Sequence, residues 1–393
     1  MLKVLVVENG AGFGGALTSL ESLLSALPRD RCEVHVLIGY PQDCVRPGGA
    51  VRGVAVLERE RRYGSNAPLQ KRLAGIFGGR AGNAAFVVDH LTTGRRFASA
   101  VARLVRERGV DVVHGNNGVL VNDAVIFGAR RAGRPCVIHS RGTEYPSRVA
   151  AWLARKVDHF LPVSGYVGDT VRAFGVPEER ITVVPEGLDA TAFAAGADGA
   201  AVRAELDLAP GTPVVGMVGC LVAWKGHSVF LDACARTLAR RGAVALIAGG
   251  APGGDPGAVD RLRARTAELG VADRVRFLGH RSDVPSVMAA CDVVVHASTE
   301  PEPFGRVILE AMALGRPVIA ARAGGPGEFV REGVDGLLTP PGDAAALAEA
   351  LDRLLADADL RARLGTGGRE GVARYSIERH VELVLGVWER LAG

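Results

Sequence analysis

Three side chains in the second half of the chain have the types and spacing that could hold a diphosphate and a sugar. Lys225 lies in the loop "CLVAWKGH", and only four of the 47 basic residues are lysines, so a lysine inside a glycine loop is unusual here. Glu302 and Glu310 follow in "EPFGRVILEAMALGRPV". An ammonium group neutralises a phosphate oxygen as a movable point charge. Two carboxylates would repel a diphosphate, so hydroxyl groups are their expected partners, and the set predicts a nucleotide-sugar site.

Short buried strands and the helices that follow them must position these residues. The strand "PVVGMVG" precedes the lysine loop, and "DVVVHAS" precedes the loop with Glu300 and Glu302. A helix is expected to begin near Gly305. Its first backbone N–H groups, from Phe304 through Val307, lack partners within the helix and form an anion site.

The same alternation runs along almost the whole chain and predicts the fold class. Five near-continuous Val/Ile/Leu runs precede a small-residue break at about 188–201, and five more follow it. Such runs are typical of parallel strands covered by helices on both faces. The sequence therefore predicts two doubly wound, Rossmann-like α/β domains, and a last amphipathic helix follows "RYS" at 374–376.

The first loop, "VENGAGFGGALTSL", matches the dinucleotide-binding pattern G-x-G-x-x-G at Gly10, Gly12 and Gly15. A dinucleotide site also needs an acidic residue at the far end of the second strand. That strand, "EVHVLIGY", carries Glu33 at its beginning instead. A nicotinamide enzyme is therefore disfavoured, and the glycines either approach a phosphate or form a tight turn.

Composition limits the remaining function classes. A net charge of +4 does not suggest nucleic-acid binding, and no apolar run reaches the length of a membrane span, so we expect a cytoplasmic protein. The six cysteines are scattered, which favours free thiols over disulfides or zinc.

Residues 59–96 carry a net charge of +6, which leaves two interpretations. The segment is a solvated insertion, or it faces an anionic acceptor or the inner face of a membrane.

The spacing E-x7-E from Glu302 to Glu310 resembles that of the retaining GT-B glycosyltransferases of glycosyltransferase family 4. The resemblance covers nearly the whole chain and includes "GGA" at 14–16, "CVIHS" at 136–140, "VPEGLD" at 184–189, "GCLVAWKG" at 219–226, "FLGHRSDV" at 277–284 and "AGGPGEFVREGVDGLL" at 323–338. It implies a GT-B fold in which two domains face a central cleft. Residues 1–187 would form the acceptor domain and 201–375 the donor domain, and the helix at 376–393 would pack back on the first.

The resemblance implies a role for each matching residue. Lys225, Glu302 and His139 are the expected catalytic residues: Lys225 neutralises the β-phosphate, Glu302 holds the transferred sugar, and His139 lies beside the sugar ring. Glu310 would hold the ribose hydroxyls. The remaining expected donor-binding residues are Gly15 over the diphosphate, position 220 in the lysine loop, Arg281 near the base, Phe304 and Gly305 at sugar hydroxyls, and Arg306 and Val307 at phosphate.

Two positions depart from the family pattern. Cys220 replaces the usual arginine of the lysine loop, and Glu186 replaces the usual asparagine before Gly187. The first change weakens the grip on a diphosphate unless Arg141, His227 or Arg306 supplies a substitute cation. The second bears on the hinge between the domains.

The expected reaction moves a sugar from a nucleoside diphosphate donor to an acceptor hydroxyl with retention, as in a hexosyltransferase. UDP is the first choice of nucleotide and GDP the second. The acceptor would be a glycan, a lipid-linked sugar or a small natural product, as in polysaccharide, glycolipid or natural-product biosynthesis. No metal or other cofactor is expected, because the one D-x-D, at Asp357 and Asp359, lies far from the other motifs in the sequence. A sugar-nucleotide epimerase or hydrolase and a non-catalytic binding module are the alternatives.

Overall fold

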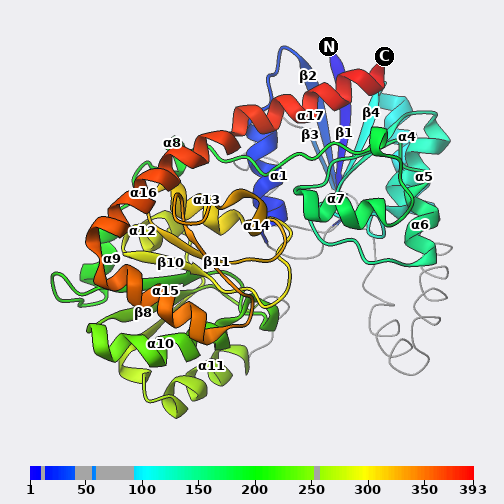
Figure 1. Ribbon diagram of the computed structural model, residues 1–393. Coiled ribbons are helices and arrows are strands. Elements are labelled where there is room, and N and C mark those ends of the chain that lie inside the picture. The colour runs from blue at the N-terminus through cyan, green and yellow to red at the C-terminus, as the bar shows by residue number, and fades with distance from the viewer. Residues whose placement is uncertain (10–13, 40–54, 59–92, 252–256) are drawn as a thin grey trace. The chain divides into compact units, whose positions relative to one another are not determined.

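A computed structural model describes residues 1–9, 14–39, 55–58, 93–251 and 257–393. The chain divides into two compact units, the first formed by Met1–Pro185 with His380–Gly393 and the second by Glu186–Arg379 (Figure 1).

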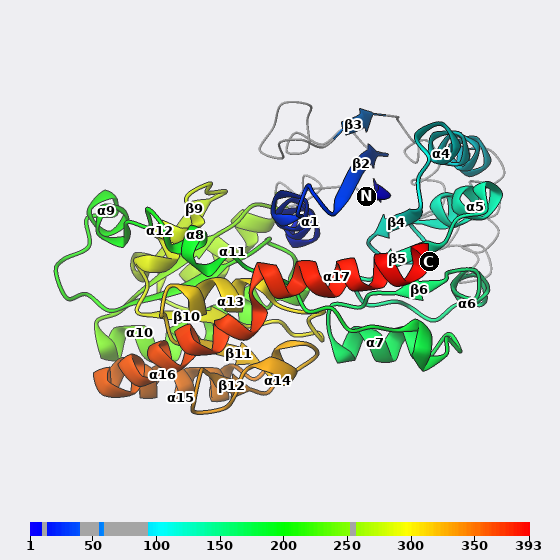
Figure 2. The same cartoon turned by 90° about the horizontal axis from the view of Figure 1, so that it is seen from above.

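The first unit is built on a parallel six-stranded sheet with the order β3-β2-β1-β4-β5-β6. Its strands are β1 (Leu2–Glu8), β2 (Cys32–Ile38), β3 (Ala55–Glu58), β4 (Val112–Asn116), β5 (Cys136–His139) and β6 (His159–Phe160). Its helices are α1 (Gly15–Ala26), α4 (Arg95–Arg108), α5 (Asp123–Ala132), α6 (Arg148–Ala154), α7 (Gly165–Arg172), a 3₁₀ turn at Glu178–Arg180, and most of α17 (Ile377–Ala392). Helix α1 lies on one face of the sheet and α4 and α5 on the other (Figures 1 and 2).

The second unit repeats this plan with a parallel sheet of order β12-β11-β10-β7-β8-β9. Its strands are β7 (Val214–Val218), β8 (Val244–Ala248), β9 (Val275–Gly279), β10 (Val293–His296), β11 (Val318–Ala321) and β12 (Leu337–Thr339). Its helices are α8 (Ala190–Ala194), α9 (Gly199–Glu205), α10 (His227–Arg241), α11 (Gly257–Glu268), α12 (Val284–Ala289), α13 (Arg306–Ala313), α14 (Pro326–Phe329), α15 (Ala344–Ala356) and α16 (Ala358–Val372), with 3₁₀ turns at Ala223–Lys225, Ala272–Arg274 and Ala373–Tyr375.

The predicted fold class is confirmed, since both sheets are parallel, Rossmann-like and covered by helices. The number of strands was underpredicted by one in each sheet, because β3 and β12 were not recognised. Both are edge strands of four and three residues, so they pair on one side only and are too short to show a pattern.

The C-terminal helix adds its apolar face to the first unit. Trp388 of α17 is completely buried, and its indole Nε1 donates to Nδ1 of His114 in β4 at 3.1 Å. Arg31 lies between Glu382 and Glu389 of the same helix, at 2.7 and 2.8 Å. Apolar burial therefore holds the helix on the sheet, and exposed ion pairs at its rim add little.

Candidate functional site

The lysine loop of the second unit is held against the end of β10. Gly226 has a φ of +78°, and a Cβ there would lie 1.9 Å from the carbonyl oxygen of Ala297. The Thr299 amide donates to the carbonyl of Trp224 at 2.7 Å. Only glycine permits this close approach, so the loop brings Lys225 next to the residues that follow β10.

Lys225 and Glu302 meet in a cluster that we call the Glu302 cluster (Lys225, His296, Ser298 and Glu302). Three donors converge on Oε2 of Glu302: Nζ of Lys225 at 2.6 Å, Nε2 of His296 at 3.0 Å and Oγ of Ser298 at 3.1 Å. Burial raises the pKa of Glu302, but the hydrogen bond from His296 and the charge of Lys225 outweigh it and lower the pKa to about 2. The carboxylate is therefore ionised at neutral pH.

Sequence reasoning did not single out His296 and Ser298. They precede Glu302 at the carboxyl end of β10, two residues apart, so their side chains point to the same side of the strand. Two polar residues on one face after a buried Val run are a sequence signal that could have found them.

The backbone after Glu302 leads directly into α13. The Glu302 carbonyl accepts from the Gly325 amide at 2.8 Å, and the ring of Phe304 stacks on Phe329 with centroids 5.0 Å apart. Gly305, the residue before the helix, has a φ of +92°. A Cβ at Gly305 would lie 3.5 Å from Cγ of Glu302, so the start of α13 lies beside the cluster.

Glu310 lies one turn into α13 and is ion-paired. Nε of Arg306 donates to its Oε1 at 2.9 Å, and a second guanidinium nitrogen of Arg306 reaches the Gly187 carbonyl at 3.3 Å. Burial raises the pKa of Glu310 and the charge of Arg306 opposes that rise. One oxygen of Glu310 thus already has a donor. Val307 follows Arg306 in the first turn of the same helix.

Arg281 is tied into a different part of the second unit. Its guanidinium donates to Glu205 at 2.7 and 2.9 Å and to Asp283 at 2.8 Å from both Nε and NH2. No contact between Arg281 and the Glu302 cluster is found among the described residues. The expected place of Arg281 near a base stays a prediction.

Cys220 is half-buried in the loop after β7, and its carbonyl accepts from the Val222 amide at 2.9 Å. Of the suggested substitute cations, His227 is disfavoured by its surroundings. Burial and the charge of Lys225 lower the pKa of His227 to about 4, so it is neutral at pH 7. Arg306 is held by Glu310, and Arg141 belongs to the first unit.

The remaining predicted site residues, His139 and Gly15, also lie in the first unit. His139 ends β5 and has no exposed surface, while Gly15 opens α1 with open space around its Cβ position.

Gly10 and Gly12 lie outside the described residues, as does the basic segment up to residue 92. Arg95 and Arg96 open α4. The membrane or acceptor surface at 59–96 stays a prediction.

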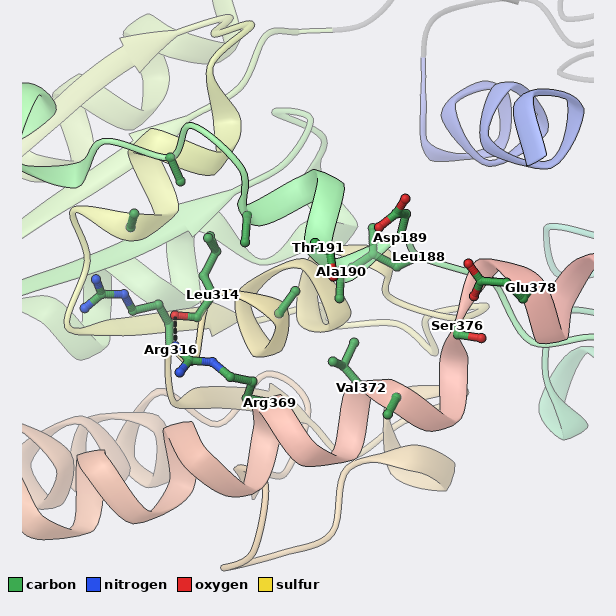
Figure 3. Close-up of a pocket in the computed structure, with 15 residues that line it drawn as sticks. Leu188, Asp189, Ala190, Thr191, Leu314, Arg316, Arg369, Val372, Ser376 and Glu378 are labelled. Carbon is green, nitrogen blue, oxygen red and sulfur yellow. Dashed lines mark hydrogen bonds between the residues drawn. The ribbon is translucent and has the colours of Figure 1, made fainter.

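A separate cavity of about 680 Å³ opens elsewhere in the second unit (Figure 3). Arg316 and Arg369 lie at one end of it and Asp189 and Glu378 at the other. Its described lining includes no member of the Glu302 cluster.

Three further properties concern the described part of the chain only. It holds no group of three metal-ligating side chains, and Asp357 of the D-x-D caps α16 by accepting from the Leu360 amide at 2.8 Å. Its five cysteines carry free thiols. None of its helices combines the length and the apolar composition needed to cross a membrane.

Two family models match the chain, one in each half. The model described as Glycosyltransferase Family 4 matches residues 13–192, and the model described as Glycosyl transferases group 1 matches residues 200–371.

Curated relatives match part of the chain. The D-inositol 3-phosphate glycosyltransferase of Nocardia farcinica is 39% identical over 229 residues, which are 56% of this chain and 50% of the relative. The lipopolysaccharide core biosynthesis glycosyltransferase LpsE of Rhizobium meliloti is 37% identical over 190 residues, which are 47% of this chain and 52% of LpsE. The chain thus spans about half the length of the curated relatives it matches.

Solved structures match the whole chain. Anabaena HepE (Alr3699) in complex with UDP-glucose is 28% identical, with a TM-score of 0.82 and 100% of both chains covered. WaaG, a glycosyltransferase involved in lipopolysaccharide biosynthesis, has a TM-score of 0.68 at 17% identity with 100% of both chains covered, which bears on the fold alone. The chain has the GT-B fold, and each of its two halves is similar to a glycosyltransferase family model.

Proposed function

We propose that this protein is a retaining glycosyltransferase that moves a sugar from a UDP-sugar to an acceptor hydroxyl. The observation that carries the proposal is the Glu302 cluster beside the start of α13, where an ammonium, a buried carboxylate and the amides of a helix start occur together. The likeness to HepE, whose complexes hold UDP and UDP-glucose, supports UDP as the nucleotide.

Each part of the second unit would have one task in this reaction. The amides of the first turn of α13 and the ammonium of Lys225 would stabilise the charge that grows on the leaving diphosphate. Glu302 would accept hydrogen bonds from the transferred sugar, and Glu310 from the ribose. The leaving diphosphate would take the proton of the acceptor on the same face, which retains the configuration of the anomeric carbon without a metal.

The acceptor is proposed to be a polyol or glycan hydroxyl. The names of the relatives support this class, since they cite D-inositol 3-phosphate and the lipopolysaccharide core. Synthesis of a polysaccharide, a glycolipid or a small natural product would fit such an acceptor.

The test is turnover of UDP-glucose with and without a panel of polyol and glycan acceptors, in the presence of EDTA. We expect acceptor-dependent release of UDP and an α-linked product that EDTA leaves unchanged. Equal release without acceptor would indicate a hydrolase, conversion to another UDP-sugar an epimerase, and binding without turnover a binding module. Activity that EDTA abolishes and a divalent metal restores would contradict the metal-free mechanism.

Replacing Glu310 by glutamine is expected to weaken binding of the UDP-sugar by about 1–3 kcal/mol, because a charged acceptor to the ribose hydroxyls becomes a neutral one. Calorimetric titration of the donor measures the change. Glu349→Gln on the exposed side of α15 is the matched control and should leave the affinity unchanged. Unchanged donor affinity in Glu310→Gln would show that Glu310 does not bind the ribose.

Replacing Cys220 by arginine is expected to tighten donor binding by about 1.5–3 kcal/mol, because a guanidinium forms charge-assisted bonds to a diphosphate and a thiol does not. Ala223→Arg, which adds the same charge at an exposed position of the same loop, is the matched control and should change the affinity less. Neutral or weaker binding in a folded Cys220→Arg protein would show that another cation already occupies that place.

A further inference from the structure

Four polar side chains gather at the carboxyl ends of three neighbouring strands in the first unit. Glu8 ends β1, Asn116 ends β4, His139 ends β5, and Arg141 follows two residues later. The strands are adjacent in the order β1-β4-β5, and Asn116 pairs in register with His139. All four residues are buried, with exposures of 2%, 0%, 0% and 7% in that order.

The donor and the acceptor of each hydrogen bond among them are settled by chemistry. A guanidinium only donates, so Oδ1 of Asn116 accepts from Nε of Arg141 at 2.6 Å. This contact orients the amide and leaves its Nδ2 to donate to Oε2 of Glu8. The other oxygen of that carboxylate accepts from Nδ2 of Asn117 at 2.7 Å.

The same rule assigns the proton of His139. The NH2 group of Arg141 lies 3.4 Å from Nδ1 of His139, and because it can only donate, Nδ1 must accept. In a neutral imidazole the proton is then on Nε2. Burial, followed by the charge of Arg141, lowers the pKa of His139 well below its usual value, so the ring remains neutral.

Nε2 of His139 has no hydrogen-bond partner within the described part of the chain. A buried N–H left without an acceptor is destabilising by about 1–3 kcal/mol. In the neighbouring ring of His114, Nδ1 accepts from Nε1 of Trp388, and Nε2 likewise has no partner within the described part of the chain. A hydrogen bond from Nε2 of His139 to a ligand oxygen would satisfy this donor.

We propose that a relay of three buried side chains, from Glu8 through Asn116 to Arg141, holds His139 as the Nε2–H tautomer. This inference rests on the proposed function in one respect, namely that the oxygen bound by Nε2 belongs to the substrate. In this arrangement His139 donates one hydrogen bond and is no proton acceptor, since Nδ1 is occupied and Nε2 already carries a proton. The three relay members are positioning residues, because they act on the substrate only through His139.

Imidazole ¹⁵N NMR of the full-length protein tests the relay without any need for activity. The signals of His139 are assigned by their loss in His139→Gln. We expect the wild-type ring to show the Nε2–H tautomer alone, and Asn116→Leu, which removes both links of the relay, to show a mixture of tautomers. Arg141→Met, which removes the donor to Nδ1, should show the same mixture and serves as the second variant where Asn116→Leu does not fold.

Ser140→Ala is the matched control. Ser140 lies between His139 and Arg141, is equally buried, and donates to Glu144 at 2.8 Å, outside the relay. Its removal should leave the tautomer of His139 unchanged. With a turnover assay, the relay variants should lose about tenfold in kcat with less than a twofold change in the donor KM.

Wild-type His139 as the Nδ1–H tautomer or as imidazolium would overturn the proposal. Persistence of a pure Nε2–H tautomer in both folded relay variants would also overturn it. A wrong proposed function would give a different result. The tautomer of His139 would still change in the relay variants, but the wild-type protein would turn over no donor.

Discussion

Replacing Lys225 by alanine is expected to lower kcat by about 10²- to 10³-fold, the usual effect of removing one donor to a developing oxyanion. In the proposed reaction the charge of the leaving diphosphate grows in the transition state, so the ammonium would stabilise that state more than the bound donor. Affinity for the UDP-sugar should therefore fall much less than kcat, and steady-state kinetics together with calorimetric titration separate the two.

Lys156→Ala is the matched control for this variant. Both lysines lie over an indole ring, Lys156 at 4.4 Å from Trp152 and Lys225 at 4.2 Å from Trp224, but only Lys225 contacts Glu302. Lys156→Ala should leave both kinetic parameters unchanged. Equal losses in affinity and kcat for Lys225→Ala would show that the lysine binds the donor but does not stabilise the transition state preferentially.

Replacing Glu302 by glutamine is expected to lower kcat/KM by about 10²-fold or more, because one charged acceptor to the sugar is lost and the ammonium of Lys225 loses its counter-charge. Glu300→Gln, an exposed carboxylate two residues earlier in the same loop, should have no effect on kcat/KM. Retention of full activity by Glu302→Gln would show that Glu302 does not bind the transferred sugar.

The same variant has an expected signature in acid. The pKa of Glu302 is lowered from an ordinary 4.5 to about 2, so the folded state binds this proton less readily than the unfolded state. The stabilisation is present above about pH 4.5 and is lost as the pH falls toward 2. Urea unfolding at pH 7 and at pH 3 should therefore show a smaller drop in unfolding free energy for Glu302→Gln than for the wild type.

The alternation of buried runs and helices was sufficient to predict two parallel-sheet domains. Strands such as β1 and β7 are covered on both faces, so most of their residues are apolar, and this run of apolar residues indicates a buried strand. The edge strands β3 and β12 were missed because an edge strand pairs on one side and needs no long apolar run. The nicotinamide alternative was disfavoured because Glu33 lies at the beginning of the second strand, whereas a dinucleotide site needs an acidic residue at its end.

The sequence also singled out Lys225 and Glu302 by residue type and rarity, although they are far apart in the chain. Only the tertiary structure decided that their side chains meet, because the contact depends on the close approach at Gly226, where a Cβ would lie 1.9 Å from the carbonyl oxygen of Ala297. It also decided that Arg306 pairs with Glu310 and that burial lowers the pKa of His227. Both outcomes depend on which groups surround a buried charge, and that is a property of packing rather than of spacing.

The first unit shows the limit of sequence patterns most clearly. "VVENG" and "HGNNG" place Glu8 and Asn116 at the ends of buried strands, which marks both as polar residues at one edge of a parallel sheet. The tautomer of His139 does not follow from that edge alone. It depends on the orientation of one amide, and the amide is oriented by the guanidinium of Arg141, which follows β5, and by the carboxylate of Glu8 at the end of β1. Sequence determines which donors and acceptors are present, while the fold decides which of them are paired, because a hydrogen bond depends on distances of a few ångströms between segments far apart in the chain.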